Sequence, residues 1–229
     1  MNDPMRDKVI VVAGAAGPAG RATVRRLAGA GARVIAADVQ AVSWDLPGVE
    51  PAVVDLLDAE GTRAFARRVV GEHGGVDGLV HLVGGWRGGA TFADTDLSDW
   101  AFLHDLLIRT LQHSTLAFCR DLARSPHGRA VIVSQPAARR PTQGNAAYAA
   151  AKAAAEAWML AMADSLTGTD AAASIVVVKA LLTDEMRERD PGKDFSGFTH
   201  VDELADVIAG LWERPAAELN GKRLDLTAA

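Results

Sequence analysis

The sequence predicts an α/β protein in which a mostly parallel, seven-stranded sheet is flanked by helices. Short runs of β-branched residues alternate with longer segments of helical periodicity, which is typical of successive strand–helix–strand units. Apolar residues make up 49% of the 229 residues, enough for one large core. Because no repeat, low-complexity tract or linker divides the chain, we expect residues 1–229 to form a single doubly wound domain.

Seven segments have the apolar, β-branched composition of buried strands. They are Val9–Ala13, Arg33–Asp38, Ala52–Asp55, Gly78–Val83, Ala130–Ser134, Ile175–Lys179 and Arg223–Thr227. Short apolar runs of this kind are expected where a parallel sheet is covered on both faces.

Helical periodicity connects these strands. The expected helices are Ala19–Ala30, Ala59–His73, Ser98–Arg124, Ala146–Thr167 and Val201–Trp212. Ser98 is the expected N-cap of its helix, because its hydroxyl can accept an unpaired N–H of the first turn. Three irregular segments, 84–96, 135–145 and 181–199, each follow a strand. They therefore meet at the sheet edge where open parallel sheets bind ligands.

Charge and cysteine content exclude several function classes. The formal net charge is −5, so no broad basic surface favours nucleic acid as a partner. The single cysteine, Cys119, excludes an internal disulfide framework, and the six histidines show no paired metal-ligand spacing, so no metal is expected. The apolar run Val9–Ala13 is too short for a signal segment or a membrane span. We expect a cytoplasmic protein without a membrane partner.

Three glycines at a spacing of three, Gly14, Gly17 and Gly20, lie directly after the first strand and before a helix. In such a turn the glycines allow a tight bend, close approach of phosphate oxygens and contact between helix and strand. Pro18 suits the first helical turn, and Ala19 follows it. The pattern predicts a pyrophosphate site at the helix N-terminus. A glycine turn without a ligand is the alternative.

Two carboxylates support the first interpretation. Asp38 closes the second strand, 24 residues after Gly14, where an acid can accept both hydroxyls of an adenosine ribose. Its charge would repel a 2′-phosphate, and Ala15, Ala16 and Val39 provide no cation to offset this, so NAD(H) is favoured over NADP(H). Asp55 closes the third strand, where it could meet adenine, cap a helix or be a solvated turn residue.

Tyr148 is the one tyrosine of the chain, and Lys152 lies four residues later in an alanine-rich helix. The two side chains therefore share a helix face. An ammonium beside a phenol favours the phenolate and lowers a pKa that starts near ~10, which makes the hydroxyl a candidate general acid and base. A surface tyrosine with a solvated lysine is the alternative.

These motifs, in their order and spacing, resemble the short-chain dehydrogenase/reductase family from about residue 7 to the last strand. The resemblance implies one Rossmann-like, nucleotide-binding domain that transfers hydride between a nicotinamide dinucleotide and a carbonyl, alcohol or related group. It implies that Tyr148 gives the proton, while Lys152 lowers the tyrosine pKa and binds the nicotinamide ribose. Val83 and Gly84 would border the cofactor, and Thr183 would contact its amide.

The sequence also departs from the family pattern. The usual catalytic serine falls on Gln135, with Ser134 one place away, and the usual helix asparagine falls near Leu107. The usual Asn-Asn-Ala-Gly segment reads His81-Leu-Val-Gly84. We therefore expect Ser134 as a candidate catalytic residue and Gln135 as a candidate substrate contact. The chain is either a divergent enzyme or a fold that has lost its chemistry.

One branch, the dihydropteridine reductases, has similar departures. That branch lacks the serine and carries a Gly-Gly-Trp-x-Gly-Gly segment, which resembles Gly84-Gly85-Trp86-Arg87-Gly88-Gly89 here. The segment from Asp194 to Thr199 is also similar. Trp86 among glycines offers a flat face for a planar ring, or it fills a gap against the core.

The leading hypothesis is therefore an oxidoreductase that uses NAD(H), with a pterin-like, conjugated or carbonyl small molecule as substrate. A dinucleotide-binding protein without turnover, acting as a sensor or structural partner, is the alternative. The retained pair of Tyr148 and Lys152 argues against it, since a pure binder needs no tunable phenol. The long helices with small-residue faces, and the resemblance, predict a homodimer or homotetramer.

Overall fold

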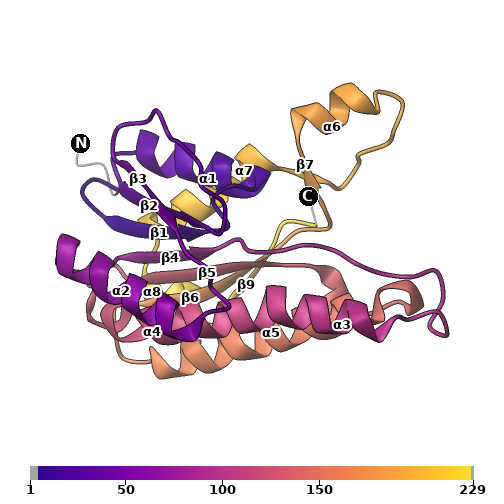
Figure 1. Ribbon diagram of the computed structural model, residues 1–229. Helices are drawn as coiled ribbons and strands as arrows, with labels where there is room; N and C mark the ends of the chain where they lie inside the picture. The colour runs from indigo at the N-terminus through magenta and orange to yellow at the C-terminus, as the bar shows by residue number, and fades with distance from the viewer. Residues whose placement is uncertain (1–4, 228–229) are drawn as a thin grey trace.

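The computed structural model describes residues 5–227. Its main sheet has seven strands in the order β3-β2-β1-β4-β5-β6-β9, and each neighbouring pair is parallel (Figure 1). The strands are β1 (Val9–Ala13), β2 (Arg33–Asp38), β3 (Val49–Val53), β4 (Gly78–His81), β5 (Arg129–Ser134), β6 (Ala172–Val177) and β9 (Arg223–Asp225). The predicted α/β fold class is confirmed.

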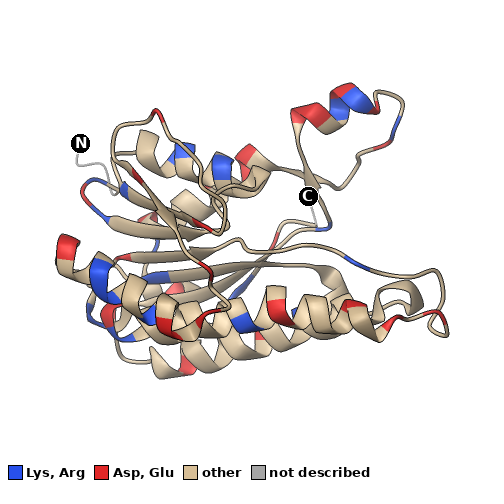
Figure 2. Cartoon of the chain, viewed as in Figure 1, with Lys and Arg blue, Asp and Glu red and all other residues tan. Residues whose placement is uncertain are grey.

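Helices cover both faces of this sheet (Figure 1). One layer contains α1 (Pro18–Gly29), α7 (Val201–Ala209) and the short α8 (Ala216–Leu219). The other contains α2 (Ala59–His73), α4 (Thr110–Arg124) and α5 (Ala146–Ser165), with α3 (Leu97–His104) continuing α4. Figure 2 shows α5 to be mostly uncharged along its length. Within residues 5–227, no helix combines the length and apolar character needed to cross a membrane.

The alternating side chains of β1 explain the two layers. Val11 packs in the same core as Phe118 of α4, whereas Ile10 packs with Leu204 of α7 on the opposite face. Successive strand residues point to opposite faces, so a continuous apolar run contributes to two cores. The sheet is therefore buried on both sides, and its carboxyl-terminal edge holds the polar and glycine-rich loops.

Two predicted boundaries are wrong for local reasons. The third strand is Val49–Val53 rather than Ala52–Asp55. Pro51 disfavours a strand in the sequence pattern, but β3 pairs on one side only, and an edge strand tolerates proline. The N-cap of α3 is Asp96 rather than Ser98, since the Asp96 carboxylate accepts the Ser98 N–H at 2.7 Å. A carboxylate adds charge to the hydrogen bond at a helix N-terminus.

The predicted helix Ser98–Arg124 forms without a break in the chain direction, but its backbone hydrogen-bond pattern changes along its length. A π-helical turn, Asp105–Arg109, separates α3 from α4 and includes Leu107. The segment predicted to be irregular after β6 contains β7 (Leu181–Leu182), α6 (Asp184–Arg189) and β8 (Thr199–His200). Figure 1 shows α6 extending away from the sheet beyond β7. The bounds of β1, β2 and α2 match the prediction, and the other helix and strand ends differ from it by at most a few residues.

Candidate active site

A cavity of about 580 Å³ lies at the carboxyl-terminal edge of the sheet. Its walls come from the turn after β1, the loop after β4, the end of β5, α5 and the segment after β6. Strand order reverses at β1, with β2 on one side and β4 on the other. Open α/β sheets bind ligands at such a reversal. The three loops that the sequence placed at this edge therefore border one cavity.

The glycine turn is shaped by close backbone contacts. Gly14 has φ of +82°, and a Cβ there would lie 2.8 Å from the backbone of Leu82 and Val83. A Cβ on Gly20 would lie 2.1 Å from the Gly14 oxygen. Gly17 caps α1 without a side-chain hydrogen bond, so the first N–H groups of the helix have no side-chain partner. These are the features that hold a pyrophosphate, and Pro18 and Ala19 line the cavity with them.

Asp38 lies beside this turn at the end of β2. One of its carboxylate oxygens accepts the Ala16 N–H at 2.9 Å, and the other accepts the Gln40 N–H at 3.0 Å. Sequence reasoning missed a neighbouring cation, Arg21, whose Nε donates to the Ala16 carbonyl at 2.9 Å and whose guanidinium lies 5.7 Å from the Trp44 ring centre. The only available signal was its position directly after Gly20.

Asp55 does not belong to this cavity. It is exposed, and its carboxylate accepts the N–H of Leu57 at 2.8 Å in the turn that follows β3. The N-cap of α2 is Asp58. The geometry excludes the helix-cap interpretation of Asp55 and shows it as a turn residue, and contact with adenine stays a prediction.

Tyr148 and Lys152 lie on the face of α5 that borders the cavity. The Lys152 ammonium donates to the Val133 carbonyl of β5 at 2.8 Å and lies 5.8 Å from the Tyr148 ring centre. Burial lowers the pKa of Lys152 to about 8, against the opposing effect of the Glu156 charge. Burial also raises the pKa of Tyr148 to about 12. The expected lowering of the tyrosine pKa is therefore not found, because desolvation dominates.

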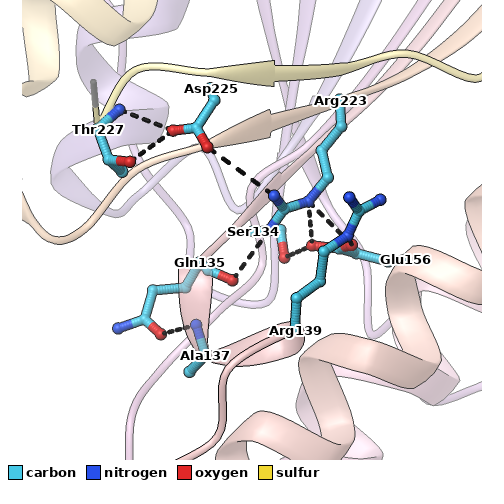
Figure 3. Close-up of polar contacts among 8 residues, drawn as sticks. All are labelled: Ser134, Gln135, Ala137, Arg139, Glu156, Arg223, Asp225 and Thr227. Atoms are coloured by element: carbon cyan, nitrogen blue, oxygen red, sulfur yellow. Dashed lines mark hydrogen bonds and ion pairs between the residues drawn. The ribbon is translucent and has the colours of Figure 1, made fainter. Parts of the chain in front are cut away.

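Ser134 and Gln135 follow each other at the end of β5 and differ in direction (Figure 3). The Ser134 hydroxyl donates to the Glu156 carboxylate at 2.6 Å, so its one proton is engaged by Glu156. The Gln135 amide oxygen accepts the Ala137 N–H at 3.0 Å, and its nitrogen donates to the Lys179 carbonyl at 3.3 Å. Both residues line the cavity.

The loop after β4 forms another wall. Val83, Gly84 and Trp86 line the cavity, and the Trp86 side chain is 64% exposed. The exposure contradicts the gap-filling interpretation of this tryptophan. Beyond it, the Gly89 N–H donates to the Gly144 carbonyl at 2.9 Å, which joins this loop to the one before α5. On the opposite side of the cavity Thr183 caps α6, and its hydroxyl accepts the Met186 N–H at 3.2 Å.

His81, which replaces the first asparagine of the family segment, is buried beneath the cavity. Its two ring nitrogens lie 3.2 Å and 3.1 Å from the hydroxyl oxygens of Thr110 and Ser114. Burial, with a smaller contribution from the Lys152 charge, lowers the pKa of His81 to about 3. The imidazole is therefore neutral across the physiological pH range, and its two hydrogen bonds link β4 to α4.

This burial predicts a pH dependence of stability. The unfolded chain binds a proton at His81 below pH 6.5, whereas the folded chain does so only near pH 3. The free energy of unfolding should therefore fall as pH decreases through this window, by up to about 1.4 kcal/mol per pH unit. Urea unfolding of the His81→Asn variant should show a shallower acid slope than the parent. The exposed His127→Asn variant is the control, and an unchanged slope in His81→Asn contradicts the assignment.

Comparison with known proteins places the chain in a family. The family model described as short chain dehydrogenase matches residues 8–194. The chain belongs to the short chain dehydrogenase family. It is 32% identical over 158 residues to a probable oxidoreductase, EphD, of Mycobacterium tuberculosis, but the match spans 65% of this chain and only 26% of that protein. It is 27% identical over 235 residues to the 3-oxoacyl-[acyl-carrier-protein] reductase FabG of Thermotoga maritima, covering 95% of each.

Solved structures agree on the fold of this short chain dehydrogenase. The NADPH-bound structure of a short chain oxidoreductase with an atypical catalytic center, from Pseudomonas aeruginosa PAO1, superposes with a TM-score of 0.81. The two chains are 24% identical, and the superposition covers 96% of each. Membership of an oxidoreductase family is thus established, whereas the similarity to dihydropteridine reductase rests on the sequence motifs alone.

Proposed function

We propose that this chain is an NADH-dependent reductase of the short chain dehydrogenase family, in which Tyr148 supplies the proton. The observation that carries the proposal is that one cavity joins the glycine turn at one end to Tyr148 and Lys152 at the other. The turn matches a dinucleotide pyrophosphate, and the pair matches proton transfer. A protein that only binds the dinucleotide has no use for a tunable phenol.

The residues present fit a nicotinamide dinucleotide. The α1 N-terminus and Gly17 would hold the pyrophosphate, Asp38 the adenosine ribose, and Val83, Gly84 and Thr183 the nicotinamide end. When bound, the dinucleotide supplies the hydride. Lys152 binds the nicotinamide ribose through its ammonium, and Tyr148 holds its proton until a substrate atom accepts it.

Asp38 favours NADH because its carboxylate would face a 2′-phosphate, while Arg21 nearby opposes this preference. Titration should show tighter binding of NADH than of NADPH. In Asp38→Ala the preference should shrink or reverse, because one charge at such a site contributes on the order of tenfold in affinity. Arg21→Gln should widen the preference for NADH, which gives a matched variant of opposite sign. Equal affinities of the parent protein for both dinucleotides would contradict the assignment.

For the substrate we propose a planar conjugated or carbonyl compound, with a pterin-like ring as the first choice. Trp86 presents an exposed aromatic face at the cavity wall, and Gln135 offers an amide N–H. The test is NADH oxidation with quinonoid dihydropterin beside a panel of aldehydes and diketones. Turnover of the carbonyl panel without turnover of the pterin would support the reductase function and contradict the pterin as substrate.

We also propose that α4 and α5 form a homodimer interface. Leu116 on α4 and Leu160 on α5 are 63% and 41% exposed, and a shallow apolar hollow between the helices includes Trp158. Exposed apolar surface of this kind is typical of association sites. Sedimentation should give a dimer, which Leu116→Glu should convert to a monomer. A monomeric parent protein at every concentration contradicts the proposal.

A further inference from the structure

A polar cluster around a buried carboxylate adjoins the cavity and has no part in the function proposed above (Figure 3). Its centre is Glu156 of α5, which is 5% exposed. Both of its carboxylate oxygens accept from Arg223 Nε at 3.1 Å, and one accepts the Ser134 hydroxyl at 2.6 Å. Arg139 Nε lies 3.7 Å from the second oxygen. We call these four residues the Glu156 cluster.

A buried carboxylate is costly unless it is paired and hydrogen-bonded. Here the charge of Glu156 is matched by Arg223, from β9, and its oxygens have several donors. Removing one partner of such a pair is strongly destabilising, because the other charge is left buried and uncompensated. The cluster therefore fixes α5, β5 and β9 relative to one another at the end of the sheet that borders the cavity.

The cluster and Lys152 form hydrogen bonds with three consecutive residues at the end of β5 and directly after it. The Val133 carbonyl accepts from Lys152, the Ser134 hydroxyl donates to Glu156, and the Gln135 carbonyl accepts from Arg223 Nη2 at 3.4 Å. In Figure 3 the Gln135 side chain extends away from Glu156, toward Ala137. One amide N–H of Gln135 donates to the Lys179 carbonyl, so a second remains to meet a ligand.

We propose that Glu156 is a positioning residue of the active site. Together with Arg223 it holds the Ser134–Gln135 segment so that the Gln135 amide, rather than the Ser134 hydroxyl, faces the substrate. Glu156 also lies one helical turn from Lys152 and keeps a negative charge near the ammonium that Tyr148 needs. This inference rests on the proposed reductase function, and it assigns Ser134 to anchoring rather than to contact with the substrate.

The charges around Lys152 support the second part of this role. The Glu156 charge raises the pKa of Lys152 against the effect of burial. Tyr148 faces the ammonium from the same helix, His81 faces it from β4 and is neutral, and Lys179 borders the same cavity. Glu156 is thus the anion that favours the charged form of Lys152.

Glu156→Gln tests the proposal, since it keeps the shape and an acceptor for Ser134 but removes the charge. NADH titration from pH 6 to pH 9 should show affinity declining at a midpoint about one pH unit lower than in the parent. Hydrogen exchange at the Ala137 amide, which Gln135 holds, should accelerate. Asp164→Asn, an exposed change of the same charge on the same helix, should alter neither. An unchanged midpoint together with unchanged exchange overturns the proposal.

Two further variants keep the test decisive if Glu156→Gln folds poorly. With quinonoid dihydropterin or an active member of the carbonyl panel, Gln135→Ala should lower kcat/KM by about tenfold or more, because a donor to the substrate is lost. Ser134→Ala should have a smaller effect on kcat/KM but should accelerate exchange at Ala137. A larger loss of kcat/KM in Ser134→Ala than in Gln135→Ala overturns the proposal. If no compound is turned over, the reductase function is contradicted. NADH titration and hydrogen exchange then still test the positioning role of Glu156.

Discussion

Replacing Tyr148 by phenylalanine is expected to lower turnover by about a hundredfold or more, because the variant lacks the hydroxyl that donates the proton. The parent phenol carries the proton that the reductive direction requires. Burial raises the pKa of Tyr148 to about 12, so the proton is retained at neutral pH until the charge of the site changes. The phenyl ring keeps the packing of Tyr148 with Leu103, Leu107 and Ile108.

NADH affinity separates this result from a general loss of structure. The Tyr148→Phe variant should bind NADH almost as tightly as the parent and should unfold at nearly the same urea concentration. Ser134→Ala provides the comparison, since its hydroxyl is engaged by Glu156. Full turnover in Tyr148→Phe would contradict the proton-donor role of Tyr148.

Replacing Lys152 by methionine is expected to reduce both turnover and NADH affinity, each by about tenfold or more, because the ammonium both tunes the phenol and binds the ribose. Burial lowers the pKa of Lys152 to about 8, so the parent loses the ammonium as pH rises through that value. NADH affinity of the parent should therefore decline above about pH 8. The methionine variant should show weak affinity that varies little over the same range.

The stability of the parent should change in the opposite direction, which distinguishes loss of the ammonium from unfolding. Between about pH 8 and pH 10, the unfolded chain keeps the Lys152 proton while the folded chain releases it. The free energy of unfolding therefore rises with pH in this window as far as Lys152 determines it. Urea unfolding at each pH measures this rise. Parallel loss of affinity and of stability above pH 8 would contradict the account.

Elements defined by local pattern were predictable from the sequence. The strands β1 and β2 were predicted with their observed bounds, because each is an apolar run bounded by charged residues or by glycine. The glycine turn was recognisable for the same reason. In contrast, the π-helical turn at Asp105–Arg109 has no sequence signal that separates it from an α-helix, since it lies where the packing changes from α3 against α5 to α4 against the sheet.

The burial of Glu156 could not be predicted from the sequence. On an alanine-rich helix, a glutamate four residues after Lys152 is typical of a solvated surface pair. Its burial follows from partners that are distant in the chain, since Arg223 lies 67 residues away. The fold brings them together only when β9 pairs with β6 at the sheet edge. Asp55 was predicted to close a strand, but β3 ends at Val53 and Asp55 lies in the turn that follows it.

A crystal structure of the protein with NADH tests the central claim most directly. The account predicts the pyrophosphate at the N-terminus of α1, the adenosine ribose on Asp38, and the nicotinamide between Val83 and Thr183 with its reactive carbon facing the Tyr148 hydroxyl. A structure in which NADH lies outside this cavity, or in which the nicotinamide is directed away from Tyr148, would contradict it.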